Sequence, residues 1–250
     1  MSSTHQGLLL PGDTPVHRLA PQCKVAATAL FVIAVACTPA GEYWPYLWYL
    51  LLLTMVAVLA QLPPFIMARR LLVEVPFVVF VLTLPLLGGA PQLTVLGVTL
   101  SVTGLHAAAT IALKATFGLL ATGVLVATTS PPEIITGLER LRVPRVFTAV
   151  AAFMVRYLEV LAAELARMRT AAACRGGNPR WLWQVRDVTT GLGALIIRSF
   201  ERGERVYLAM VSRGYTGALP AELSGTAAPR AAWAGALTVP ALAAIGLVLA

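Results

Sequence analysis

Charged residues are scarce in this chain. Only 12% of its 250 residues are Asp, Glu, Lys or Arg, whereas 58% are hydrophobic, and the mean hydropathy is +0.79. Soluble globular domains carry roughly 25% charged residues. This shortage of charge excludes an ordinary soluble domain and indicates an integral membrane protein.

Cysteine and histidine are also few, and neither type is clustered. The chain has three residues of each type, namely Cys23, Cys37, Cys174, His5, His17 and His106. An odd number of scattered cysteines gives no disulfide framework, and the histidines lack the close spacing of metal-ligating side chains. We therefore predict no metal site.

A nucleotide-binding loop is missing as well. The pattern G-x-x-x-x-G-K-[ST] does not occur, so the chain is not an ATPase by that mechanism. An integral-membrane enzyme would need a cluster of titratable groups at membrane depth, and only Lys114 lies clearly inside a predicted span. We expect a non-catalytic chain that binds no cofactor itself.

Five apolar runs are long enough to cross a bilayer, which takes about 17–25 residues. They lie near residues 24–40, 43–62, 72–90, 104–129 and 231–249. The sequence therefore predicts an all-α integral membrane protein with about five transmembrane helices. Its parts are an N-terminal membrane domain (1–130), a cytoplasmic helical domain inserted before the last span (131–229) and a C-terminal transmembrane helix (230–250).

The basic residues between the spans predict the orientation in the membrane. Arg18 and Lys24 precede the first span, Arg69 and Arg70 separate the second from the third, and 14 of the 19 basic residues follow the fourth. Positively charged loops remain in the cytoplasm. We therefore place the N-terminus and the helical domain in the cytoplasm, the C-terminus outside, and the protein in the plasma or inner membrane.

Two features of the membrane domain leave alternatives open. The region from Gly88 to Gly104 is rich in helix breakers and has an alternating apolar pattern, so it is either a re-entrant or interfacial hairpin or an ordinary outer loop.

Lys114 lies near the middle of a span, where a charge is costly. It either contacts a partner subunit or is a snorkelling or internally paired lysine. Glu74 is expected at the membrane interface.

The segment after the fourth span has the pattern of amphipathic helices. Ser130, two prolines and Glu133 mark the start of a short helix that reaches Leu141. Two longer helices follow, one over residues 144–174 and one that ends at Arg213-Gly214. Each has an apolar residue every three or four positions. The stripes comprise Val146, Val150, Phe153, Tyr157, Leu161, Leu165, Met168 and Ala172 in the first helix, and Val185, Val188, Leu192, Leu195, Ser199, Val206 and Met210 in the second.

These two helices are predicted to be cytoplasmic, because charged residues interrupt their apolar stripes too often for membrane spans. Gly203 breaks the second stripe, and its missing side chain would let another backbone approach closely. We predict that Gly203, Tyr157 and Met210 contribute to packing of the helices.

Both long helices end in similar tripeptides, Cys174-Arg175-Gly176 and Ser212-Arg213-Gly214. Glycine commonly stops a helix, and the helix dipole favours arginine in the last turn, so capping alone explains either ending. Two such endings would also present paired guanidinium groups to the carboxylates or carbonyls of a partner. The repetition favours docking. A protein partner fits better than nucleic acid, because the arginines are mixed with acids.

Several motifs resemble those of one transporter family. The most specific is Arg198-Ser-Phe-Glu-Arg-Gly-Glu-Arg-Val-Tyr-Leu-Ala-Met-Val-Ser-Arg-Gly-Tyr-Thr-Gly217. Asn178-Pro-Arg-Trp181, Arg156-Tyr157 and Pro15-Val-His-Arg-Leu-Ala-Pro21 followed by Lys24 support it. Over nearly its whole length the chain resembles the transmembrane T component of energy-coupling-factor (ECF) transporters, the EcfT/CbiQ family, and most closely the cobalt-transport branch CbiQ.

The resemblance implies a coupling role in an ABC-type importer. In that family two Ala-Arg-Gly signatures end coupling helices, and their arginines seat in grooves of two cytoplasmic ABC-type ATPases. Arg175 and Arg213 hold the matching positions, while Cys174 and Ser212 replace the usual alanine with another small residue. The resemblance further implies that the ATPases bind ATP and Mg²⁺. A separate membrane S component captures the substrate, and moving coupling helices tilt it within the membrane.

The same resemblance indicates cobalt as the transported substrate, because the segment from Arg198 to Gly217 is most like the cobalt branch. A vitamin or another transition metal is the alternative, since the S component selects the substrate. A rival from another class is a membrane scaffold whose cytoplasmic helices bind something other than an ATPase.

Overall fold

The computed structural model describes residues 14–39, 41–63, 65, 67, 71–83, 85, 92–95, 98–175, 185–215 and 228–248. The described chain divides into two compact units. The larger unit takes in the residues up to Leu141 together with those from Ala228 onwards, and the smaller unit runs from Arg142 to Tyr215.

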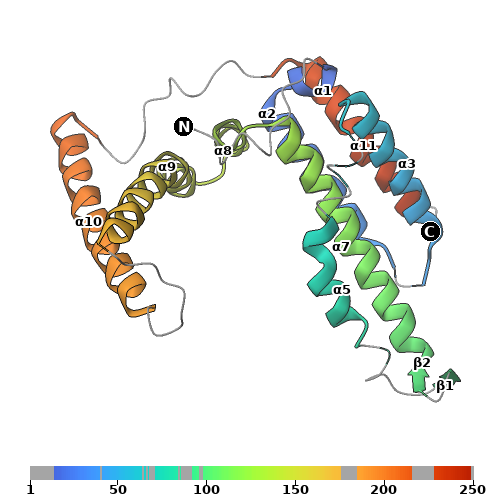
Figure 1. Cartoon of the computed structure of the whole chain (residues 1–250). Coiled ribbons are helices and arrows are strands. Elements are labelled where there is room, and N and C mark those ends of the chain that lie inside the picture. The colour runs from blue at the N-terminus through green and yellow to red at the C-terminus, as the bar shows by residue number, and fades with distance from the viewer. Residues whose placement is uncertain are drawn as a thin grey trace. The chain divides into compact units, whose positions relative to one another are not determined.

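Helices make up most of the larger unit (Figure 1). They are α1 (Pro15–Arg18), α2 (Pro21–Cys37), α3 (Trp44–Leu59), the 3-10 turn η1 (Leu72–Glu74), α5 (Val75–Val81), α7 (Val102–Thr128), α8 (Pro131–Arg140) and α11 (Arg230–Val248). Proline occupies the first turn of α1, α2, α3, α5 and α8, where its missing N–H costs no helical hydrogen bond. These prolines set where several helices begin.

Three of the described helices are long and apolar enough to cross a membrane, namely α7, α11 and α9 (Arg145–Cys174). The helices α2 and α3 and the stretch Leu72–Val81 are apolar but shorter. The first, second, fourth and fifth predicted spans therefore coincide with helices α2, α3, α7 and α11. In the third span α5 ends at Val81 and Pro85 is again helical, while residues 84 and 86–90 of the predicted span lie outside the described residues.

Helix α9 differs from the prediction that charges exclude it as a span. By length and composition it qualifies, because its N-terminal half is apolar from Val146 to Val155 and the first charge after Arg145 is Arg156. Length and composition alone do not place a helix in a bilayer. The assignment of α9 to the cytoplasm stays a prediction.

A short β-hairpin precedes α7 in the otherwise helical chain. Strands β1 (Gln92–Val95) and β2 (Val98–Ser101) pair antiparallel, with Gln92 opposite Ser101 and Val95 opposite Val98. Ser101 then starts α7, since its hydroxyl accepts a hydrogen bond from the Gly104 N–H at 3.2 Å, a common N-cap. The alternating pattern in this region is thus explained by a hairpin, and its depth in a membrane stays a prediction.

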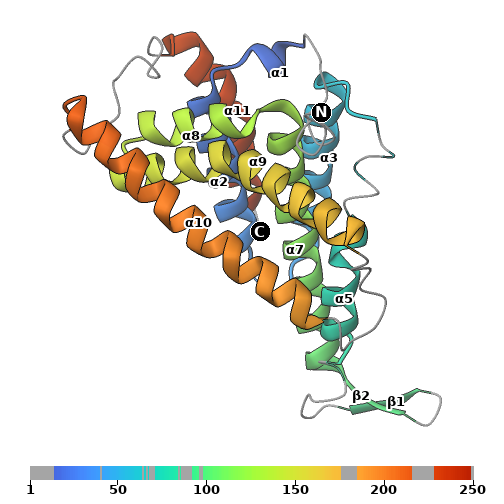
Figure 2. The same ribbon diagram turned by 60° about the vertical axis from the view of Figure 1, so that its left-hand side comes forward.

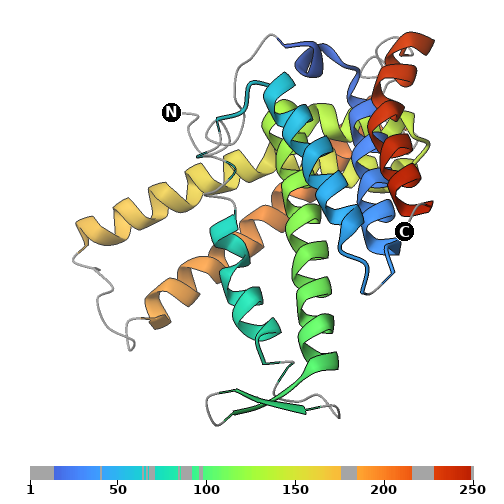
Figure 3. The same ribbon diagram turned by 90° about the vertical axis from the view of Figure 1, so that its right-hand side faces the viewer.

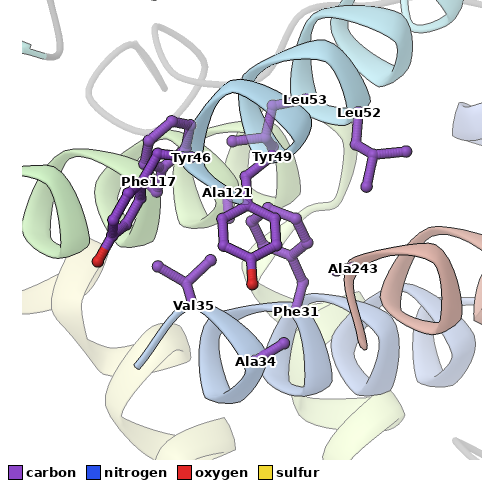
Figure 4. Packing of buried hydrophobic residues seen from close by; sticks show 10 residues of the cluster. All are labelled: Phe31, Ala34, Val35, Tyr46, Tyr49, Leu52, Leu53, Phe117, Ala121 and Ala243. Carbon is purple, nitrogen blue, oxygen red and sulfur yellow. The ribbon is translucent and has the colours of Figure 1, made fainter. Parts of the chain in front are cut away.

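The core of the larger unit lies where α2, α3, α7 and α11 meet (Figures 3 and 4). Its buried side chains are Phe31, Ala34, Val35, Tyr46, Tyr49, Leu52, Leu53, Phe117, Ala121 and Ala243. Tyr49 packs edge-on against Phe31 and Phe117, with ring centroids 5.8 and 6.2 Å apart, a geometry that aromatic rings favour. The Tyr49 hydroxyl lies 3.1 Å from Thr38 Oγ1, so its polar end has a partner inside the core.

Two glycines allow close contacts between helices. A Cβ on Gly246 of α11 would lie 2.7 Å from Cδ1 of Trp48, whose Nε1 donates to a backbone carbonyl of α11 at 2.9 Å. A Cβ on Gly137 of α8 would lie 3.1 Å from backbone atoms of Pro21 and Gln22. This contact holds α8 against the start of α2. Helix α8 therefore belongs to the larger unit, whereas the sequence places it with the helices that follow.

The smaller unit consists of two long helices, α9 and α10 (Val185–Ser212), which lie against each other (Figure 2). Both agree with the predicted ranges. Helix α9 begins one residue after Pro144, which takes an extended backbone conformation as its N-cap. Helix α8 also starts as predicted, since the Ser130 N–H donates to Glu133 Oε2 at 2.8 Å, one half of a capping box.

Candidate functional site

The C-terminal end of α10 closes in a Schellman motif. Gly214 has a left-handed φ of +83°. Its N–H donates to Val211 O at 2.9 Å, and the Tyr215 N–H donates to Met210 O at 3.0 Å. This pair of bonds is a common way for helices to end at glycine. Gly214 therefore caps the helix, while Arg213 is exposed and forms no ion pair with any described residue.

The end of α9 is similar as far as it is described. Cys174 is the last helical residue, and the Arg175 N–H donates to carbonyls of the preceding turn at 3.1 and 3.3 Å. Cys174, Arg175 and, at the other end, Ser212 are all exposed. Gly176 lies outside the described residues. Within the described part of the chain Arg175 has no acidic partner either, so both arginines are accessible to another molecule.

A carboxylate on α9 joins the two long helices. Arg202 Nη2 donates to Glu164 Oε2 at 2.7 Å, and Arg198 Nη1 lies 3.6 Å from Glu164 Oε1. The two arginines are one turn apart on α10, so both reach the same carboxylate. The Glu164 side chain is only 10% exposed. We call this arrangement the Glu164 bridge.

The bridge favours the ionised form of Glu164. The hydrogen bond from Arg202, together with the positive charges of Arg202 and Arg198, holds the pKa of the Glu164 carboxyl below its usual range, although burial acts in the opposite direction. Ion pairs of this kind stabilise the charged form of the acid. The sequence did not reveal the bridge. In it, Glu164 is one of the charges that interrupt an apolar stripe, and Arg198 and Arg202 are part of the motif from Arg198 to Gly217.

The two helices carry more apolar surface than their mutual contact covers. Several residues of the predicted stripes are half-buried, including Tyr157 and Met210, but the stripe residues Val146, Val150 and Leu192 are exposed. Further apolar side chains are exposed as well, comprising Phe147, Met154 and Leu158 on α9 and Ile196, Ile197, Phe200, Tyr207, Leu208 and Val211 on α10. We call these the exposed apolar faces. Exposed apolar surface on this scale is typical of an interaction site.

Gly203 lies on the exposed apolar face of α10, between Phe200 and Tyr207. Helix α10 runs unbroken from Val185 to Ser212, so the glycine interrupts the stripe but not the helix. A Cβ at Gly203 would meet no described atom within 4 Å. No described backbone therefore approaches Gly203 in this structure, and its predicted role in packing of the helices stays a prediction.

Gly203→Leu is therefore expected to leave the fold of the chain intact and to weaken its assembly with a membrane partner. Exposed substitutions of this type usually change stability by less than about 0.5 kcal/mol beyond their helix propensity. Melting in mild detergent and recovery of co-purifying chains measure the two effects. Ala209→Leu is the control, since Ala209 is also exposed on α10 but lies on the opposite side of the helix from Phe200. Equal assembly of both variants would refute a role for Gly203.

Lys114 is paired inside the larger unit. Its Nζ donates to Ala36 O at 2.7 Å, a carbonyl in the last turn of α2, where carbonyls lack partners within the helix. The helix dipole also favours a cation at this end. Internal pairing thus accounts for the lysine, and a contact with a partner subunit stays a prediction.

Glu74 is buried against another helix of the larger unit. Only 8% of it is exposed, and its Oε1 accepts a hydrogen bond from Thr116 Oγ1 at 2.9 Å. Thr116 is near the middle of α7, so Glu74 is paired inside the unit. Its position at the membrane interface stays a prediction.

The buried ammonium of Lys24 connects three helices of the larger unit. Lys24, on α2, is 7% exposed, and its Nζ donates to His17 O of α1 at 2.9 Å and to Thr128 O of α7 at 3.0 Å. Both carbonyls belong to helix ends, which attract cations. Lys24 therefore holds the N-terminal segment against the end of α7.

Fold and site together define a class of protein. The chain is an all-α, multi-pass membrane protein with two long amphipathic helices whose C-terminal ends expose arginines. Within that class, residues 12–223 match the family described as cobalt transport protein, CbiQ. The chain belongs to this family.

Relatives with assigned names place the family among transporters. The chain is 28% identical over 224 residues to the energy-coupling factor transporter transmembrane protein EcfT of Heliobacterium modesticaldum, which covers 84% of each chain. It is 29% identical over 226 residues to EcfT of Bacillus selenitireducens, covering 84% of this chain and 83% of the relative. The cobalt transport protein CbiQ of Rhodobacter capsulatus is 30% identical over 124 residues, 48% of this chain and 50% of its own. The chain is thus a T component of the EcfT/CbiQ family, a transmembrane part of an ECF or cobalt transporter.

Proposed function

We propose that this chain is the coupling subunit of an ECF-type ABC importer and transmits ATP-driven motion from cytoplasmic ATPases to a membrane S component. The observation that carries the proposal is the pair of exposed arginines, Arg175 and Arg213, at the ends of two helices that Glu164 joins. A subunit that transmits motion needs both accessible contact points and a stiff connection between them.

The two arginines are the contacts with the ATPases. A guanidinium presents several donors in a fixed fork, which suits carboxylates and carbonyl groups lining a groove. Arg175 and Arg213 each bind one of two ABC-type ATPase subunits, which hold the ATP and Mg²⁺. Cys174 and Ser212 are small enough to let the adjoining arginine enter such a groove. This chain contributes no cofactor site.

The Glu164 bridge and the exposed apolar faces carry the motion further. Because Glu164 binds two arginines of α10 at once, a displacement of one helix pulls on the other. The apolar side chains that α9 and α10 leave exposed contact the S component and the lipid membrane. The N-terminus and coupling helices are cytoplasmic and the C-terminus lies outside, in line with the distribution of Lys and Arg.

Cobalt is the proposed substrate of the assembled transporter. The family match is described as a cobalt transport protein, and one relative is named cobalt transport protein CbiQ. Several other relatives are named only as EcfT, which keeps a vitamin or another transition metal as the alternative. The scaffold hypothesis is less favoured, since a relative whose alignment covers 84% of the chain is named as a transporter component.

Uptake of radiolabelled cobalt tests the substrate directly. Deleting this chain from its own cells is expected to lower uptake from trace cobalt at least roughly tenfold, because a coupling subunit is required for every transport cycle. Expression of the wild-type chain restores it. Unchanged cobalt uptake with reduced uptake of a vitamin would favour the alternative substrate, and no transport defect of any kind would favour the scaffold.

A further inference from the structure

A cavity in the larger unit lies among α1, α2, α3, α7 and α11, the last four of which lie side by side in Figure 3. Its volume is about 370 Å³, within the range of roughly 300–1,000 Å³ for small-molecule sites. Most of its lining is aliphatic, with Leu52, Val56, Leu59, Val124, Val239 and Leu242 among the contributing side chains. The proposed coupling function does not use it.

Threonines add little polarity to this lining. Thr128 Oγ1 donates to Val124 O at 2.9 Å, and Thr238 Oγ1 donates to Gly235 O at 2.8 Å. These two hydroxyls are therefore bonded to the backbone of their own helices. The hydroxyl of Thr28, the third threonine of the lining, has no such bond and is the one polar group that the threonines leave unpaired among the described lining residues. The body of the cavity suits a hydrocarbon.

Lys24 is the one charged residue among the described residues that line the cavity. Its ammonium has three N–H donors, and the carbonyls of His17 and Thr128 accept two of them. No acceptor for the third lies among the described residues. Glu133 contributes negative charge nearby, but its carboxylate accepts the capping bond from the Ser130 N–H. A cation in apolar surroundings is stabilised by an anion.

The shape and the charge together identify the ligand as an amphiphile with a negative head. A partner helix does not fit, because a single turn about 10 Å wide and 5.4 Å high already fills roughly 400 Å³. A single acyl chain is much narrower. We infer that this cavity binds one acyl chain of an anionic phospholipid, with the headgroup phosphate at the Lys24 ammonium.

Gly235 gives a way to close the cavity without disturbing the helices. It lines the cavity on α11, and a Cβ there would meet no described atom within 4 Å. Gly235→Phe therefore places a ring in the space that the acyl chain takes. Gly118→Phe is the matched control, since Gly118 on α7 also has open space around its Cβ and is not among the lining residues.

Native mass spectrometry of the full chain, stripped of lipid in mild detergent and titrated with dioleoyl phosphatidylglycerol, tests the inference. We expect one tightly bound lipid for the wild type and for Gly118→Phe, and at least roughly tenfold weaker binding for Gly235→Phe, since a blocked chain loses several buried methylenes. Dioleoyl phosphatidylcholine, which has no net charge, should bind roughly fivefold more weakly to the wild type.

Several outcomes would overturn the inference. Equal lipid binding by Gly235→Phe and Gly118→Phe would show that lipid binds elsewhere, and equal binding of the two lipids would overturn the assignment of an anionic lipid. Retained lipid with loss of a co-purifying membrane protein in Gly235→Phe would assign the cavity to a protein. Circular dichroism confirms that each variant is folded, and Gly235→Leu replaces the phenylalanine variant if that one is not.

Discussion

Glu164→Lys is expected to separate the motions of the two long helices and to lower ATP-driven uptake by roughly 100-fold. The lysine would bring a third cation beside Arg198 and Arg202, at a site where the native side chain is only 10% exposed. Loss of the carboxylate also leaves the charges of Arg202 and of the more exposed Arg198 uncompensated. Misplacement of a functional group by about 1 Å can cost roughly 100-fold in rate. Here the positions of both Arg175 and Arg213 depend on the Glu164 bridge between their helices.

Spin labels on Cys174 and on a cysteine introduced at Ser212 measure the effect on the helix ends, with the other two cysteines replaced by alanine. The distribution of distances between the labels should broaden in Glu164→Lys. Glu201→Lys is the control, because exposed Glu201 pairs only with Arg205 at 3.9 Å and such surface pairs contribute little. If Glu164→Lys kept the wild-type distribution and uptake, the bridge would not couple the helices.

Lys24→Met is expected to destabilise the larger unit by about 2–4 kcal/mol, since an unsatisfied buried polar group costs about 1–3 kcal/mol and two carbonyls lose their donor. Those carbonyls, of His17 and Thr128, lie in segments that are distant in sequence. Their loss should therefore loosen α1 and the end of α7 together.

Thermal unfolding in mild detergent measures this loss, and Lys114→Met provides the comparison. Lys114 also donates to a helix-end carbonyl, but it has a single acceptor and is less buried, so its replacement should cost only about 1 kcal/mol. Equal destabilisation by the two variants would show that the Lys24 contacts add nothing to stability.

Local signals in the sequence predict much of the fold. The serine, prolines and glutamate at residues 130–133 give the start of α8, and Pro144 gives the start of α9. Gly214 gives the end of α10, because only a residue that tolerates positive φ closes a Schellman motif easily. The helix boundaries in the third predicted span were less predictable. The 3-10 turn η1 leads there into α5, which ends at Val81, four residues before Pro85, although the apolar run continues.

Tertiary contacts explain what the sequence does not reveal about the candidate site. The two arginine endings are visible as a repeated motif, but the Glu164 bridge joins residues 38 positions apart, and the Lys24 contact with Thr128 spans 104 positions. No local pattern encodes such pairs. The one available signal was the spacing of Arg198 and Arg202, which places two cations on one face of α10. This spacing does not indicate which acid on another helix binds them.

The cap at Gly214 changes how the arginine ending of α10 is understood. Glycine capping and partner docking are not alternatives there, since Gly214 closes the helix through its backbone while Arg213 remains exposed. The arginine is thus available for the docking role proposed for it.

Native co-purification of the wild-type chain and of Arg175→Glu/Arg213→Glu in mild detergent, with every accompanying chain identified by mass spectrometry, tests the coupling claim most directly. The wild type should recover ABC-type ATPases and a small membrane protein. The double variant should lose the ATPases by at least roughly tenfold while keeping its membrane insertion, because two like charges replace two donors at the contact. Full retention of the ATPases by the folded double variant would contradict the account.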